Sequence, residues 1–302
     1  MTFPLVPRGR LIGLSFGTMR SFRRGTGSDV VDSRPYRRGD DVHSIDWAAS
    51  ARRSAALQSD EFIVREHYAD EAPRVVIACD RRPGMSCYPS PLPWLDKARA
   101  AQETAELLMR SAVGAGGFVG YLDHADGTPY WEPPRGGRRP REVMEKRFAA
   151  APFTAPPDSL ERALDHLAEH RRVVTSGAFV FVLSDFLPPP SDETWLQVLE
   201  HRWDFVPVVI QDPTWEQSFP DVHGLAVPLR EPRTGRVAPV RLTAREAEER
   251  RDANERRFDA LLEVFRGLDL DPVLVSSTDP SAILSSFLGW SEARRTRQVV
   301  RA

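Results

Sequence analysis

Two aspartates that directly follow apolar segments are the residues best placed to bind a ligand. Asp80 comes after the run from Pro73 to Cys79, and Asp185 comes after the run from Phe179 to Ser184. Continuous apolar runs of this length are typical of parallel strands that are covered on both faces. Because ligands of open α/β sheets bind beyond the carboxyl ends of the strands, we expect both carboxylates at that edge of a sheet.

Charged side chains also concentrate near the N-terminus, where they surround two turn-forming residues. Pro35 fixes a turn, and Gly39 supplies a permissive backbone position. The segment can be interpreted as a structural turn held together by ion pairs. The less favoured interpretation is a docking or metal site built from three aspartates, Asp40, Asp41 and Asp46.

The same segment contains two large apolar residues and a specific pattern. Ile45 and Trp47 fall on one face of an extended strand, so we expect them to anchor the segment to a core. The pattern R-x-Y-x-x-G-D-D-x-x-x-I-D-W-x-x-x-A-R resembles the signature of the domain-of-unknown-function 58 family, whose members have a von Willebrand factor A-like domain. Its residues in this chain are Arg34, Tyr36, Gly39, Asp40, Asp41, Ile45, Asp46, Trp47, Ala51 and Arg52.

The resemblance implies a metal-ion-dependent adhesion site, in which Asp-x-Ser-x-Ser, a threonine and a second aspartate surround Mg²⁺. Asp80 and Asp185 match the two aspartates, but Arg82 and Gly84 stand where the serines are expected. Ser159 lies beside the threonine position. We therefore expect a degenerate site without a metal, in which Arg82 either pairs with both carboxylates or points to solvent.

No other pattern in the sequence indicates catalysis. The histidines show no spacing with serine or cysteine that is typical of a nucleophilic triad. His166 and His170 lie one helical turn apart, but no acid–base partner between them stands in the metalloprotease arrangement, so we expect a solvated helix face. The glycines from Gly114 to Gly117 lack the lysine of a P-loop and are interpreted as a helix stop. The chain is therefore not expected to be an enzyme.

The overall composition is that of an ordinary globular protein. The chain has 302 residues, a formal net charge of -2, 41% hydrophobic residues and 28% charged residues, which gives no reason to expect a nucleic-acid partner. Its two cysteines, Cys79 and Cys87, indicate no disulfide framework. No apolar run approaches the length of a membrane span. We therefore expect a cytoplasmic protein.

Alternating apolar strands and amphipathic helices predict an α/β fold with a doubly wound, mainly parallel sheet of von Willebrand factor A-like, Rossmann-like type. We expect an N-terminal extended segment with the signature (residues 1–72), the α/β domain (73–290) and a flexible Arg-rich tail (291–302). A hairpin is predicted from Leu225 to Leu242. A capping box at Thr243 opens a long charged helix.

The expected function comes from the resemblance, which implies a non-enzymatic protein-interaction or adaptor module. Such a module would work with a MoxR-type AAA+ ATPase in protein assembly or maturation. Its interaction face would combine the Asp80/Asp185 edge with the segment from Arg34 to Trp47. One alternative is a divalent-metal-dependent hydrolase that uses the N-terminal aspartates or the strand-end pair. Another is a scaffold whose basic N-terminal arm contacts nucleic acid or anionic lipid.

Overall fold

The computed structural model describes residues 1–8, 16–36, 45–57, 62–88, 94–137, 139–231 and 234–301. The chain divides into two compact units. One is formed by Gly9–Pro73, and the other by Met1–Arg8 together with Arg74–Ala302. The domain boundary expected after residue 72 lies one residue from this division, whereas the first eight residues belong to the larger unit.

The smaller unit contains two antiparallel strands and one helix. β1 (Phe16–Pro35) pairs with β2 (Ile63–Glu71), and several register shifts interrupt the pairing. α1 (Trp47–Leu57) lies between the two strands in the sequence. The helix is capped by Asp46, whose Oδ1 accepts a hydrogen bond from the amide of Ala49 at 3.0 Å.

Trp47 is not part of an extended strand, so that prediction was wrong. It is the first residue of α1, its side chain is 62% exposed, and its ring makes an edge contact with Phe62 at 5.9 Å. Ile45 is half-buried and forms an isolated bridge with Val64. The capping carboxylate of Asp46 and the alanines that follow it favour a helix at this point.

The larger unit is built on a six-stranded sheet. All neighbouring strands are parallel except β4 and β5 at one edge. In spatial order the strands are β10 (Val273–Val275), β7 (Asp204–Ile210), β6 (Phe179–Ser184), β3 (Arg74–Cys79), β4 (Phe118–Asp123) and β5 (Tyr130–Arg135). The chain continues from β3 to β4 on one side and later adds β6 on the other, so the order reverses between β3 and β6. This confirms the predicted doubly wound, mainly parallel sheet.

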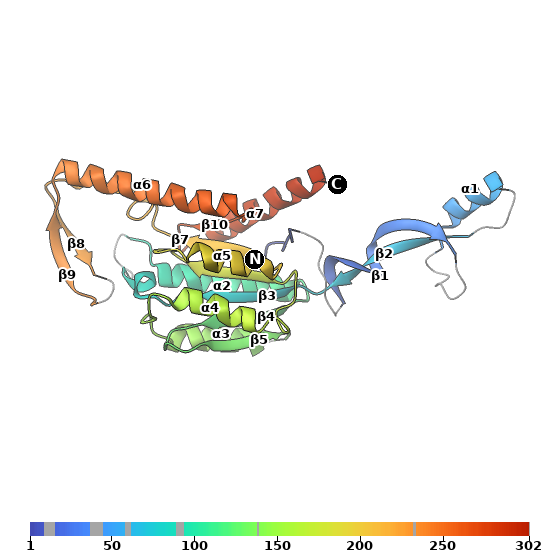
Figure 1. The fold of residues 1–302 in the computed structure, drawn as a ribbon, viewed down its shortest axis with the longest axis horizontal. Coiled ribbons are helices and arrows are strands. Elements are labelled where there is room, and N and C mark those ends of the chain that lie inside the picture. The colour runs from blue at the N-terminus through green and yellow to red at the C-terminus, as the bar shows by residue number, and fades with distance from the viewer. Residues whose placement is uncertain are drawn as a thin grey trace. The chain divides into compact units, whose positions relative to one another are not determined.

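Helices cover both faces of the sheet (Figure 1). On one face, side chains such as Leu164, Trp195 and Phe265 form a core with the strand residues that point toward them. On the other face, Phe287 packs against Phe181 of β6, with ring centroids 6.3 Å apart. The helices are α2 (Lys97–Gly114), α3 (Arg139–Ala150), α4 (Ser159–Glu169), α5 (Asp192–Glu200), α6 (Ala244–Gly267) and α7 (Pro280–Arg301), with a short 3-10 turn, η2 (Pro83–Ser86), after β3.

Residues 291–301 form the end of α7, and this differs from the flexible tail expected there. Arg294 is buried because its guanidinium pairs with Asp204 at 2.9 Å and with Asp271 at 3.0 Å. Its Nη1 also donates to the carbonyl of Val6. Acids from two distant parts of the sequence therefore hold an Arg-rich helix end in place.

The predicted hairpin is present as β8 (Ala226–Arg230) and β9 (Val237–Arg241), with Gly235 at a φ of 68° in its turn. The predicted capping box at Thr243 is also confirmed, and it opens α6. No helix within the described part of the chain is both long and apolar enough to cross a membrane.

Candidate functional site

The sheet brings Asp80 and Asp185 together, as expected from their positions after two apolar strands. Asp80 follows β3 and Asp185 follows β6, and these two strands are neighbours at the point where the strand order reverses. Both residues are buried, each with 2% of its surface exposed. Ionised carboxylates at such depth require partners, because an unpaired buried charge is strongly unfavourable.

Arg82 is the partner of Asp80 and also approaches Asp185. Its Nε and Nη2 donate to Asp80 Oδ2 at 2.9 and 2.7 Å, and Nη2 lies 3.7 Å from Asp185 Oδ1. Nη1 donates to the carbonyl of Pro188. Burial opposes the charge on Arg82, but the carboxylate of Asp80 outweighs it and raises the pKa of the guanidinium. Arg82 therefore remains a cation between the two acids instead of pointing to solvent.

Lys97 supplies a second cation that the sequence analysis missed. It is the first residue of α2, and its Nζ lies 2.7 Å from Asp185 Oδ2 and 2.5 Å from Glu216 Oε1. Burial would lower the pKa of Lys97, but the two carboxylates outweigh that effect and raise it above the ordinary lysine value. A lysine in the first turn of a helix is unfavourable for the helix dipole. The unfavourable position of Lys97 was therefore the feature of the sequence that could have indicated a role for this residue.

Hydroxyl and amide groups bind the remaining carboxylate oxygens. Ser184 Oγ donates to Asp80 Oδ2 at 2.7 Å, and the amide of Arg82 donates to Asp80 Oδ1 at 2.8 Å. The amide of Leu187 donates to Asp185 Oδ1 at 2.9 Å. Every oxygen of the two strand-end carboxylates thus accepts at least one hydrogen bond from the protein.

These residues do not fit the Mg²⁺ ion that the family resemblance led us to consider. Mg²⁺ needs several oxygen ligands in octahedral geometry, whereas Arg82 and Lys97 direct positive charge at the same oxygens. At Gly84, a Cβ atom would lie 3.1 Å from Asp185 Oδ2, so a serine there would be crowded. Ser159 is buried at the start of α4, and its hydroxyl has no hydrogen-bond partner within the described residues.

A cavity of about 430 Å³ adjoins Asp185, Lys97 and Glu216. Two kinds of side chain dominate the rest of its lining, namely aromatic rings and guanidinium groups. The rings of Trp94 and Trp215 are 5.1 Å apart. The aromatic residues are Tyr88, Trp94, Trp215 and Phe219, and the guanidinium groups belong to Arg230, Arg250 and Arg257.

The three guanidinium groups make no ion pair with any carboxylate in the described ranges. Arg257 Nη2 donates to the carbonyl of Glu216 at 2.9 Å, and Arg230 Nη1 donates to the carbonyl of Cys87 at 3.4 Å. The guanidinium of Arg250 lies over the ring of Phe219, with 5.8 Å to the centroid. Lys97 is already neutralised by its two acids. The cavity therefore presents positive charge beside aromatic surface.

The N-terminal signature residues do not form a described cluster of carboxylates. Asp46 caps α1, and its amide donates to the carbonyl of Ile63. Tyr36, Ala51 and Arg52 are exposed, and Arg34 lies on β1 opposite Val64. The signature residues Gly39, Asp40 and Asp41 lie outside the described residues.

The fold and its strand-end site define a doubly wound α/β protein in which internal cations occupy the switch point of the sheet. Residues 32–259 match the family described as "Protein of unknown function DUF58", and the chain belongs to that family. The recognition of the family from the Arg34–Arg52 pattern is thus confirmed.

Relatives in two mycobacteria share 28% identity with this chain over 231 residues. They are the uncharacterized protein Rv1480 of Mycobacterium tuberculosis and the uncharacterized protein Mb1516 of Mycobacterium bovis. The match covers 73% of this chain and 66% of each relative, so it spans slightly less than two thirds of their length. Among solved structures, the conserved hypothetical protein BatB from Bacteroides thetaiotaomicron is similar over 73% of this chain and 99% of its own, with a TM-score of 0.42 and 15% identity.

Proposed function

We propose that this protein is a non-enzymatic interaction module, and that the cavity beside Asp185 binds an acidic segment of a partner protein. The carrying observation is the set of three guanidinium groups, from Arg230, Arg250 and Arg257, that line the cavity without a carboxylate partner in the described part of the chain. Arginine binds carboxylates in a bidentate manner, so these groups match aspartate or glutamate side chains.

The aromatic lining supports the same proposal. Tyr88 stacks on Trp94 with ring centroids 4.8 Å apart, and Trp215 packs edge-on against Phe219. Tryptophan, tyrosine and arginine are enriched among the residues that dominate binding energy at protein interfaces. An occupant would place an apolar side chain against these rings and its carboxylates against the guanidinium groups.

The state of the strand-end acids argues against hydrolysis. Asp80 and Asp185 accept hydrogen bonds from Arg82, Ser184 and Lys97, and the positive charges of Arg82 and Lys97 oppose the binding of a metal cation at the same oxygens. A phosphoesterase assay with Mg²⁺ or Mn²⁺, comparing the wild type with Asp40→Ala, tests the hydrolase alternative. We expect no divalent-dependent turnover in either protein.

We further propose that the partner is a MoxR-type AAA+ ATPase, and that the pair acts in the assembly or maturation of other proteins. The basis is the family resemblance carried by the signature from Arg34 to Arg52. An acidic surface segment of the ATPase would be the part that enters the cavity.

A binding experiment with paired arginine variants tests this proposal. The MoxR-type ATPase encoded by the same genome would be titrated with wild type, with Arg250→Ala/Arg257→Ala and with Arg256→Ala. Arg256 is the matched control, because it lies on the same helix but has a 74% exposed side chain and pairs with Asp252. We expect the double variant to bind about 10- to 100-fold more weakly, as loss of two interface arginines predicts.

Two results would count against the proposal. First, if the wild type does not bind the ATPase, the ATPase is excluded as the partner. Second, if the double variant and the Arg256→Ala control bind equally well, the cavity is excluded as the binding site. A further expected property is a loss of affinity with rising salt, since exposed charge contacts are screened.

A further inference from the structure

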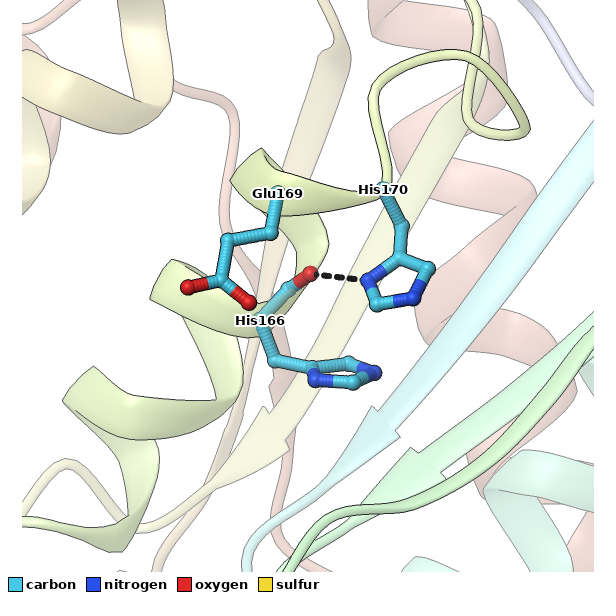
Figure 2. A group of neighbouring side chains, drawn as sticks. All are labelled: His166, Glu169 and His170. Atoms are coloured by element: carbon cyan, nitrogen blue, oxygen red, sulfur yellow. Dashed lines mark hydrogen bonds between the residues drawn. The ribbon is translucent and has the colours of Figure 1, made fainter.

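The end of α4 brings together two imidazoles and a carboxylate, as Figure 2 shows. His166, Glu169 and His170 each offer one ligand atom, and these atoms lie within 4.8 Å of one another. The spacing explains the convergence, because residues three and four apart are neighbours on one side of a helix. The solvated face expected for the two histidines is not what the structure has, since both rings are half-buried and lie about 6.0 Å from Trp131.

The hydrogen bonding of His170 leaves it prepared to act as a ligand. Its Nδ1 lies 2.8 Å from the carbonyl oxygen of His166, and a carbonyl can only accept. Nδ1 therefore carries the hydrogen, and Nε2 carries the free lone pair. A histidine that donates one ring N–H to a backbone carbonyl while the other nitrogen binds a metal is the usual arrangement in metal sites.

His166 is also available in the form that a metal requires. Its Nε2 is buried and has no hydrogen-bond partner in the portion of the chain that the structure describes. A nitrogen of an imidazole ring that has no hydrogen-bond partner is available to coordinate a metal.

From this geometry we propose that His166, Glu169 and His170 form a Zn²⁺ site with one open coordination position. Two imidazoles and one carboxylate are a ligand set that zinc accepts in sites where water or another molecule completes the tetrahedron. Zinc bonds of about 2.1 Å allow ligand atoms up to about 4.2 Å apart. Figure 2 shows the carboxylate of Glu169 on the Nδ1 side of His170, so the exposed side chain of Glu169 would have to rotate toward the Nε2 atoms to complete the site.

The proposed site is independent of the strand-end acids and of the arginine-lined cavity. Its ligands come from one helix and its C-terminal cap, whereas the other site uses the ends of β3 and β6 and the start of α2. The chemistry also differs, since zinc prefers nitrogen ligands that Mg²⁺ does not seek. Binding at one site therefore predicts nothing about the other.

Zinc titration of the full chain, after removal of metals by a chelator, tests the proposal. We expect one equivalent of Zn²⁺ to bind with a Kd of roughly micromolar or below in competition with a chromophoric chelator. His170→Ala and Glu169→Gln should each weaken binding at least about tenfold. Glu169→Gln keeps the side-chain shape at an exposed position, so its effect does not depend on the folding of the histidine variant.

His201 provides the matched control. It is also a half-exposed histidine packed on a tryptophan, with its ring 4.6 Å from that of Trp203. It belongs to no cluster of potential metal ligands among the described residues. His201→Ala should therefore bind zinc as the wild type does. The proposal is overturned if the wild type binds no zinc at about 100 micromolar, or if Glu169→Gln and His170→Ala bind as tightly as His201→Ala.

Discussion

The switch point of the sheet and the end of α4 both combine carboxylates with nitrogen-containing side chains, but they do so with opposite consequences. At the switch point, Asp80 and Asp185 face the protonated groups of Arg82 and Lys97. At the end of α4, the carboxylate of Glu169 lies beside imidazoles that have free lone pairs. In the first cluster the carboxylates are therefore already paired with cations of the same chain. The second cluster remains able to bind a metal cation.

The comparison shows that acidic residues alone do not make a metal site. The strand-end aspartates occupy the position where open α/β sheets bind ligands, yet each is held by cations and amides of its own chain. Whether acidic residues can form a metal site depends on the nitrogen groups beside them. Groups that donate hydrogen bonds neutralise the carboxylates, whereas groups with a free lone pair can coordinate a metal together with them. Breaking the internal cations should therefore damage the protein, whereas the histidine cluster should tolerate substitution.

The largest effect is expected from removing the buried cation at the start of α2. Lys97→Met would leave Asp185 and Glu216 without their shared partner, and losing one member of a buried ion pair costs about 3–5 kcal/mol. Urea unfolding of the variant would measure the loss in free energy of unfolding. Adding Asp185→Asn should recover part of that loss in free energy of unfolding, because it removes one of the two buried charges that Lys97→Met leaves unpaired.

Arg141→Met is the control for this substitution. Arg141 pairs with Glu145 on an exposed helix surface, where its side chain is 58% exposed. Exposed pairs of this kind contribute little to stability, because solvent and salt screen the attraction. If Lys97→Met were no more destabilising than Arg141→Met, Lys97 would not be the internal counter-ion of the site.

A smaller effect is expected from filling the space at Gly84. The new Cβ of Gly84→Ala would lie 3.1 Å from Asp185 Oδ2, and that oxygen is held by Lys97. Overpacking against a group that cannot move costs roughly 1–3 kcal/mol. Gly289→Ala in α7 is the comparison, since nothing lies within 4 Å of its Cβ position. It should be neutral or stabilising by about 0.5–1 kcal/mol, so equal behaviour of the two variants in thermal unfolding would refute the crowding.

Part of this account could be predicted from the sequence, and the reason is geometric. The carboxyl ends of neighbouring parallel strands share one edge of a sheet, so apolar runs ending in Asp80 and Asp185 placed both acids correctly. Lys97 was missed because its role depends on where the first turn of α2 comes to lie over that edge. Local sequence does not specify that placement.

Two other expectations differ from the structure, one for a local reason and one because of long-range contacts. Trp47 was assigned to a strand by alternation, but the side chain of Asp46 caps a helix at that point. The segment after residue 290 is rich in arginine and was expected to be flexible. Arg294 instead pairs with Asp204 and Asp271, which precede it by 90 and 23 residues, and is buried with them.

The smallest predicted effect concerns pH. Burial, followed by the charge of Arg162, lowers the pKa of His124, while Asp123 and Asp158 act in the opposite direction. A histidine with a lowered folded-state pKa contributes its full stability above its ordinary value of about 6.5, and loses it as the pH falls further. The urea midpoint should therefore decrease between pH 7 and pH 5.

His124→Gln should reduce that decrease without abolishing it, because the pKa of His166 is lowered in the same direction. His201→Gln, at the partly exposed ring on Trp203, is the control. A His124→Gln variant with the same pH slope as wild type would show that the buried imidazole does not contribute.

The most direct test of the central claim is a calorimetric titration of the chain with Mg²⁺ and, separately, with Mn²⁺, using wild type and Asp80→Asn. Because Arg82 and Lys97 already neutralise the strand-end acids, we predict no binding attributable to Asp80 with either ion at millimolar concentration. Tight binding that disappears in Asp80→Asn would contradict this account, since it would mean that a metal displaces the internal cations.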